Sequence, residues 1–135
     1  MTDGFSHQAL NLKEQKPLVY TATSKHLFYF RQHISKFVLE QGGVPLNPFM
    51  LFDYFFLDTI DRDLVREANN NVVLKSDEIR VFGPISNGVL AEIQIAKGLN
   101  KSIKYFAIQK SKTIIAIEKD QVEMEDEVKE FRGEL

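Results

Sequence analysis

The sequence of 135 residues contains no cysteine. This absence excludes disulfides, thiolate nucleophiles and cysteine-based zinc sites together, and it is compatible with a reducing compartment. The sequence also lacks an apolar run of the roughly 18 residues that a membrane span requires. Its beginning, MTDGFSHQAL, has neither the basic start nor the apolar middle of an export signal. We therefore expect a cytoplasmic protein with no membrane partner.

Strong charge of one sign is also missing. The formal net charge is −2, which gives no electrostatic indication of DNA or RNA binding. The sequence has no Walker motif and no Gly-x-Gly-x-x-Gly dinucleotide loop. His26 and His33 are spaced by two helical turns, but no third ligand accompanies them, so solvated or capping histidines are the expected interpretation. We expect neither a metal nor a cofactor.

Charge is unevenly distributed along the chain. Residues 118–135 contain 8 acids and 3 bases, whereas residues 1–117 contain 11 acids and 14 bases. The expected interpretation of DQVEMEDEVKEF is a solvated C-terminal helix. The alternative is that this acidic tail folds over a basic pocket entrance on its own subunit or on a neighbouring one.

The hydrophobic pattern predicts alternating strands and helices after a loose arm at residues 1–15, within a single domain at 16–135. The Phe-rich run 49–56 is predicted to pack as a lid or short helix over one end of the sheet, because it is too aromatic for an exposed loop. Helices are predicted from Ser24, as N-cap, to the stop at Gly42 and Gly43, over 57–74 with fraying in the asparagines, and from Asn87, as N-cap. The second is expected to place Ile60, Leu64, Val65 and Ala68 on one face. Strands are predicted at 17–23, 44–46, 77–83, 102–108 and 112–118.

This order predicts an α/β fold of three layers. A flavodoxin-like, five-stranded and mainly parallel sheet would carry helices on both faces. Ligands of such folds bind outside the carboxyl ends of the strands. Functional residues are therefore expected at 20–24, 46–49 and 82–88.

Glu92 stands out one helical turn after the third of these regions. In the stretch FGPISNGVLAEIQIAKGL, helical geometry places this carboxylate inside or at the edge of the apolar stripe formed by Val89, Ile93 and Ala96. Burial would raise its pKa while the positive end of the helix would lower it, so the sign of the shift is open. An acid at the border of an amphipathic helix is the alternative to a functional role.

Three stretches of the sequence resemble the sequences of a known family. They are PLVYTATS, GGVPLNPF and SDEIRVFGPISNGVLAEIQIAKGLNKSIKYF. Across residues 17 to 108, the sequence resembles the nucleoside 2-deoxyribosyltransferase-like superfamily, which includes nucleoside deoxyribosyltransferases and nucleotide N-glycosidases. The match is strongest from Asn87 to Glu92 and continues through Ala96, Gly98 and Lys101.

The resemblance implies an enzyme that cleaves N-glycosidic bonds, with Glu92 as nucleophile and Tyr20 as the residue that positions it. Its partner would be a small nucleoside or nucleotide, and family members usually form homo-oligomers. Backbone amides near Ser86 would hold the sugar 5′ end or a phosphate. The residues expected to bind substrate are Thr21, Ala22, Ser24, Asn47, Phe49, Asn69, Gly83, Pro84, Ser86, Asn87 and Gly88.

Two amides distinguish this sequence from the transferases of the superfamily. Asn87 stands where those enzymes commonly carry an acid that binds sugar hydroxyls, and Asn69 stands near their base-contacting acid. Hydrolysis, another N-glycosidic substrate and binding without turnover therefore remain open. The non-enzymatic alternative is a nucleotide-binding or regulatory module on the same fold.

Overall fold

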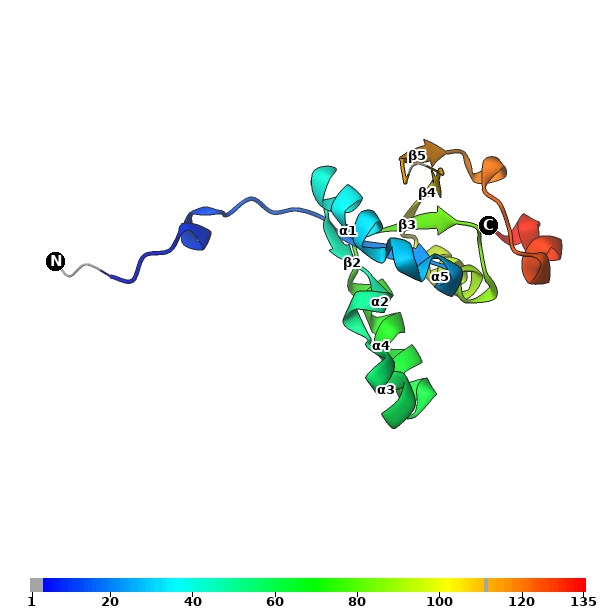
Figure 1. Ribbon diagram of the computed structural model, residues 1–135, viewed down its shortest axis with the longest axis horizontal. Helices are drawn as coiled ribbons and strands as arrows, with labels where there is room; N and C mark the ends of the chain where they lie inside the picture. The colour runs from blue at the N-terminus through cyan, green and yellow to red at the C-terminus, as the bar shows by residue number, and fades with distance from the viewer. Residues whose placement is uncertain (1–3, 111) are drawn as a thin grey trace.

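A computed structural model describes residues 4–110 and 112–135 (Figure 1). Its centre is a five-stranded sheet in the order β2-β1-β3-β4-β5. The parallel pairs are β1–β2, β1–β3 and β3–β4, while β5 runs antiparallel to β4. The strands are β1 (Leu18–Thr23), β2 (Val44–Leu46), β3 (Glu78–Gly83), β4 (Ser102–Ile108) and β5 (Ile114–Ile117). The predicted fold class, α/β with a five-stranded and mainly parallel sheet, is confirmed.

Helices cover both faces of this sheet. Helix α1 (Arg31–Glu40) contributes Ile34 and Val38 to a core cluster on one face, together with Val19 of β1. The larger cluster on the other face includes Tyr20 and Ala22 together with residues from α4 (Arg62–Lys75) and α5 (Asn87–Gly98). Successive strand residues point to opposite faces, so β1 is buried on both sides, as its continuous apolar run predicts.

Two predicted helices begin or divide differently from the prediction. Ser24 is a cap, but it caps the 3-10 helix η2 (Lys25–Phe30), which leads into α1. The helix predicted over 57–74 is divided into α3 (Tyr54–Thr59) and α4. The break follows from Asp61, whose Oδ1 accepts a hydrogen bond from the Asp63 amide at 2.8 Å and so starts a new helix.

The predictions for the interior of that helix are also wrong. Helix α4 continues through the asparagines to Lys75 instead of fraying. Ile60 is the C-cap of α3, so it does not share a helix face with Leu64, which lies on α4 and is 62% exposed. The packing of α4 against α5 and β1 involves its C-terminal half, where Val73 is fully buried.

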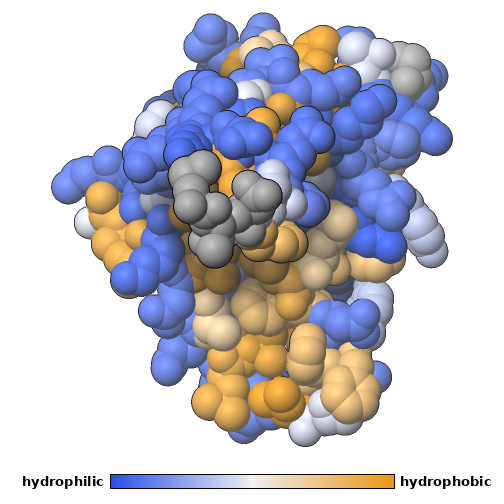
Figure 2. Space-filling model, turned by 90° about the vertical axis from the view of Figure 1, so that its left-hand side faces the viewer, coloured by the Kyte–Doolittle hydropathy of each residue, from blue (hydrophilic) through white to orange (hydrophobic). Residues whose placement is uncertain are grey.

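The Phe-rich run forms the short helices α2 (Pro48–Leu51) and α3, as one prediction allowed, but α3 does not pack as a lid. Tyr54 and Phe55 are 57% and 65% exposed, because α3 contacts mainly α4 and lies beyond the sheet. Figure 2 shows apolar side chains gathered at the lower end of the molecule, where Figure 1 places α3. We call this the α3 surface; it comprises Met50, Leu51, Tyr54, Phe55, Phe56, Leu57, Ile60 and Leu64.

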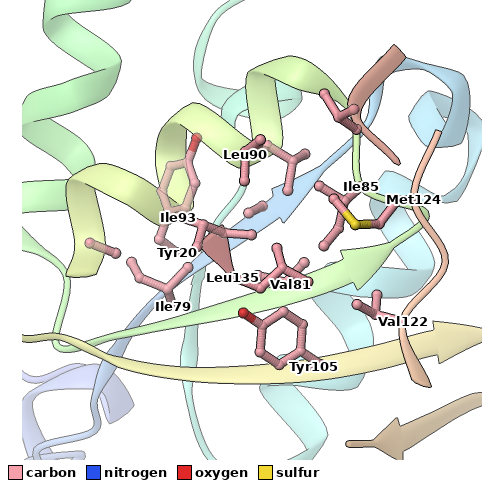
Figure 3. Close-up of a cluster of buried hydrophobic side chains, with 14 of the residues drawn as sticks. Tyr20, Ile79, Val81, Ile85, Leu90, Ile93, Tyr105, Val122, Met124 and Leu135 are labelled. Carbon is pink, nitrogen blue, oxygen red and sulfur yellow. The ribbon is translucent and has the colours of Figure 1, made fainter. Parts of the chain in front are cut away.

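The C-terminal segment is not a solvated helix. After η3 (Lys119–Gln121) the chain runs beside the loop that follows β3, where Ile85 and Met124 form a bridge, and it ends in the 3-10 helix η4 (Asp126–Glu134). Val122, Met124, Val128 and Leu135 join the larger core cluster (Figure 3). The segment is acidic on its exposed side and apolar on its inner side, and burial of the apolar side fixes it to the protein.

The beginning of the described chain lies apart from the core. Residues 4–17 are exposed and include the short 3-10 helix η1 (Gln8–Asn11). Within residues 4–110 and 112–135, no helix has the length and apolar character that crossing a membrane demands.

Candidate functional site

Three polar side chains meet where β1, α4 and α5 come together. The Tyr20 hydroxyl donates a hydrogen bond to Glu92 Oε2. Asn69 Nδ2 lies 2.8 Å from the Tyr20 oxygen and 3.0 Å from Glu92 Oε2, so the amide donates to both. Figure 3 shows the Tyr20 ring within the core and its hydroxyl directed at α5. The structure thus brings together three of the residues named from the sequence.

The local sequence explains this geometry. Tyr20 alternates with Val19 and Thr21 along β1, which turns its ring toward the face covered by α4 and α5. Glu92 is followed by the fully buried Ile93 and lies one turn before the fully buried Ala96, so its side chain leaves α5 at the border of the packed stripe. The contact between α4 and α5 supplies Asn69 from the side.

The environment of Glu92 decides whether its pKa is raised or lowered, which the sequence leaves open. Desolvation by burial raises the pKa of Glu92 from 4.5 to about 8, which means that burial outweighs the helix terminus. Among the described residues, none of the ion pairs includes Glu92. Without a cation nearby, this carboxyl is mostly protonated at neutral pH in the free protein.

Asn69 has an unused acceptor. Its Oδ1 is buried and has no hydrogen-bond partner within the described part of the chain, although its Nδ2 is shared between Tyr20 and Glu92. Leaving a buried carbonyl oxygen without a partner costs about 1–3 kcal/mol. A bound molecule with an N–H group beside Asn69 would remove that cost.

The helix surface at Gly88, on the N-terminal side of Glu92, is open. Gly88 is one turn earlier on the same side of α5. A methyl group added at Gly88 would meet only the Ser86 hydroxyl, at 4.0 Å. The surface of α5 one turn before Glu92 is therefore not covered by another side chain.

The beginning of α5 differs from the prediction. Ser86, not Asn87, is the N-cap, and its Oγ accepts a hydrogen bond from the Val89 amide at 3.3 Å. Asn87 is the first helical residue, and its amide faces Glu127 Oε1 at 3.5 Å. Serine caps a helix as well as asparagine does, so the pair Ser86–Asn87 could not be resolved from residue type alone.

Three other predicted residues lie away from Glu92 or have structural roles. Thr21 faces the opposite side of β1 from Tyr20, and its hydroxyl donates to the Leu46 carbonyl at 3.4 Å. Asn47 caps α2 through the Phe49 amide, and the Phe49 ring packs edge-on against Phe28. Strand alternation explains why Thr21 cannot line a pocket that contains Tyr20.

A second polar cluster lies at the ends of β1 and β3. The Ser24 hydroxyl donates to Glu125 Oε2 at 2.6 Å, and His26 Nδ1 lies 3.1 Å from the same oxygen. Gly83 also packs closely against the C-terminal segment, because a Cβ there would come within 2.6 Å of Val122 Cγ2. Of the predicted residues, Ser24, Gly83 and Pro84 thus lie against the C-terminal segment.

This cluster borders a shallow hollow of about 470 Å³. The hollow lies outside the carboxyl ends of β1 and β3, where the connections leave in opposite directions and where ligands of such folds bind. A second hollow, of about 390 Å³, is lined by residues of α4 and α5 and by Leu99. Glu92 lines neither of them. The first is lined by His26, Leu27, Pro84, Glu123, Met124, Glu125, Asp126 and Lys129.

Glu125 and Glu127 were not recognised from the sequence. They lie in an acidic run in which no spacing or neighbouring residue marks them off from the other carboxylates. Only the position of the folded C-terminal segment brings them to Ser24 and to the start of α5. Among the described residues, no group of three or more His, Asp or Glu side chains could hold a metal ion.

A comparison with protein families gives a match that covers most of the sheet and the helices packed on it. The model of a domain of unknown function, DUF7768, matches residues 19–106. The chain belongs to the DUF7768 family. No curated protein matches the sequence. The DUF7768 match contains Tyr20, Asn69 and Glu92, and it ends before the C-terminal segment that carries Glu125.

Proposed function

We propose that this DUF7768 protein cleaves the N-glycosidic bond of a nucleoside or nucleotide in the cytoplasm, with Glu92 as the nucleophile. The observation that carries the proposal is the Glu92 carboxyl, which is desolvated, is held by Tyr20 and Asn69, and follows the uncovered Gly88 by one helical turn. Perturbed carboxyl groups held by polar neighbours are typical of active sites.

The reaction would proceed in two displacements. Ionised Glu92 attacks C1′ of the sugar, a C1′–O bond forms, and the bond from C1′ to the base nitrogen breaks. The electron pair leaves with the base, which takes up a proton. Water then attacks C1′, its oxygen stays on the sugar, and Glu92 is released as a carboxylate while a proton passes to solvent. A carboxylate suits this chemistry because the transition state resembles an oxocarbenium ion.

Each neighbour of Glu92 has a role in this scheme. Hydrogen bonds from Tyr20 and Asn69 favour the ionised form that attacks. Positive charge on the sugar in the transition state replaces the missing cation beside the carboxylate. The unused Asn69 Oδ1 would accept a hydrogen bond from an N–H group of the base.

The test is base release from a panel of nucleosides, deoxynucleotides and NAD, measured by chromatography. Glu92→Gln and Glu92→Ala are expected to abolish release while the circular dichroism spectrum and the melting transition are retained. Glu67→Gln, which changes an exposed acid on α4, is the matched control and is expected to keep wild-type activity. The hydrolase proposal is wrong if wild type releases no base from any compound.

One observation favours a second candidate, a nucleotide-binding or regulatory module. Because the pKa of Glu92 is about 8, the neutral carboxyl at pH 7 can donate a hydrogen bond to a ligand rather than attack it. A binding module would raise its melting temperature with a compound from the panel yet release no base from it.

We also propose that the protein self-associates through the α3 surface. Tyr54, Phe55 and Leu64 are more than half exposed, and contiguous apolar patches of this kind mark interfaces. Aromatic residues and methionine are enriched in interface cores, which suits the composition of the surface. A second copy is the proposed occupant because one two-fold axis would cover both patches at once.

A further inference from the structure

The C-terminal segment places carboxylates where the proposed site would receive the far end of a sugar. Glu125 accepts a hydrogen bond from Ser24, the residue that directly follows β1. Ser24 is 1% exposed, so its hydroxyl is committed to this contact. Glu127 faces the amide of Asn87, the first residue of α5. Two groups that an anion could use at this edge, the Ser24 hydroxyl and the Asn87 amide, are therefore already opposed by a carboxylate.

Helix geometry relates these carboxylates to Glu92. Glu92 follows Ser86 by six residues, about 9 Å along the axis of α5. Its side chain leans toward the N-terminus of the helix, which shortens the separation. Gly88 lies between the two positions, and a Cβ there would meet only the Ser86 hydroxyl, at 4.0 Å. A pentose with C1′ at Glu92 would lie over Gly88.

The position of Asn69 gives the sugar a direction. Asn69 lies on α4, where its Nδ2 donates to Glu92 and its buried Oδ1 has no partner among the described residues. If Asn69 binds the base, C5′ of the sugar must point away from α4. That direction leads to the start of α5 and the end of β1, because the interior side is filled by Tyr20 and Ile93, both fully buried.

The charges around this end disfavour a phosphate. The hollow there is lined by the acids Glu123, Glu125 and Asp126. Its basic lining residues are Lys129 and His26. Lys129 is itself paired with Asp126 at 2.8 Å, and His26 with Glu125. Both hydrogen bonds to the Glu125 side chain fall on Oε2, so Oε1 is able to accept one from a neutral hydroxyl.

We propose that Glu125, supported by Glu127, determines substrate specificity, so that the site takes nucleosides with a free 5′-hydroxyl and rejects their 5′-monophosphates. This inference rests on the proposed function of Glu92. It assigns to the acidic C-terminal segment, which lies outside the DUF7768 match, the exclusion of phosphate by like charge.

The test compares a deoxynucleoside with its own 5′-monophosphate, using both kcat/KM for base release and the shift in melting temperature. Wild type is expected to favour the nucleoside by about tenfold or more, since a like charge held close to a phosphate at a partly exposed site is worth about that factor. Glu125→Gln is expected to reduce the preference severalfold, and Glu127→Gln to reduce it less. Raising the ionic strength should also reduce it, which a purely structural role would not do.

Glu130→Gln is the matched control, because it removes one negative charge from an exposed position of the same segment. It should leave the preference unchanged. A wild-type preference for the monophosphate, or a ratio that Glu125→Gln does not alter, overturns the specificity inference and leaves the proposed hydrolase intact. If neither compound is cleaved but both bind, the ratio of melting shifts decides the inference while the hydrolase proposal fails. If neither is cleaved nor bound, both proposals fail.

Discussion

The Glu92 carboxyl on α5 accepts a hydrogen bond from the Tyr20 hydroxyl on β1, across 72 residues of sequence. The two side chains reach each other because Tyr20 belongs to the strand face that α5 covers, and because Glu92 leaves α5 at the border of its buried stripe. Loss of the hydroxyl should therefore affect the carboxyl directly.

Tyr20→Phe is expected to lower kcat/KM for base release by about 10- to 100-fold. Removing a donor to the carboxylate raises the pKa of Glu92 further and leaves less of the nucleophile ionised. Tyr105→Phe, in the same core cluster but without a contact to Glu92, is the control and should keep activity. Equal losses in the two variants would mean that the tyrosines matter only for packing.

The pH dependence of the reaction follows from the raised pKa. Because the nucleophile must be ionised, kcat/KM should rise with pH and level off above about 8, the pKa of Glu92 in the free protein. Rates of base release between pH 5 and 9 test this expectation, with stability monitored at each pH. A rate that falls across this range would indicate that the protonated carboxyl acts, as a general acid.

The same shift predicts a pH-dependent stability. The folded pKa of Glu92 lies above its unfolded value of 4.5, so the stabilisation from the bound proton is complete below about pH 4.5 and is lost as pH rises through about 8. Glu92→Gln should remove this loss, so the variant should be more stable than wild type near pH 8, by a few kcal/mol at most. Urea unfolding at pH 5 and pH 8 measures the difference.

A parallel series in Glu67→Gln checks that the effect belongs to Glu92, because Glu67 is exposed and should give the same difference from wild type at both values of pH. If Glu92→Gln also gives the same difference at both, the carboxyl is not desolvated and the proposed site loses its main support.

Gly88 and Gly98 lie on the same helix and allow a matched test of the open space. An alanine at either position meets no protein atom closer than 4.0 Å, and it should stabilise α5 by about 0.5–1 kcal/mol if anything. Only Gly88→Ala adds a methyl group one turn before Glu92, on the side where the proposed sugar would lie. We expect it to raise KM or abolish activity, whereas Gly98→Ala should retain wild-type kinetics. Full activity in Gly88→Ala would place the substrate elsewhere.

The α3 surface gives a prediction that does not depend on catalysis. Phe55→Ser removes an aromatic ring that is 65% exposed, so it should leave the fold intact while weakening self-association. Light scattering coupled to size-exclusion chromatography measures the mass. Leu39→Ser, at a 59% exposed position on α1, is the control. A monomeric wild type at all concentrations would refute the proposed interface.

The expectations from sequence held where local pattern governs structure. Continuous apolar runs predicted the buried strands of a mainly parallel sheet, and Ser24 was recognised as a cap. The residues that meet at Glu92 were named because a resemblance places them in one site. The break at Asp61 and the cap at Ser86 were missed because a neighbouring residue offered an equally plausible cap or continuation.

What the sequence by itself determined is the order of strands and helices and the position of Glu92 on its helix, since both follow from periodicity and capping within short stretches. The tertiary structure alone decided that burial raises the pKa of Glu92, that α3 is left exposed, and that the acidic C-terminal segment comes to Ser24. The reason is physical: desolvation and charge proximity depend on which distant segments pack together, and residues 24 and 125 are neighbours only in the folded structure.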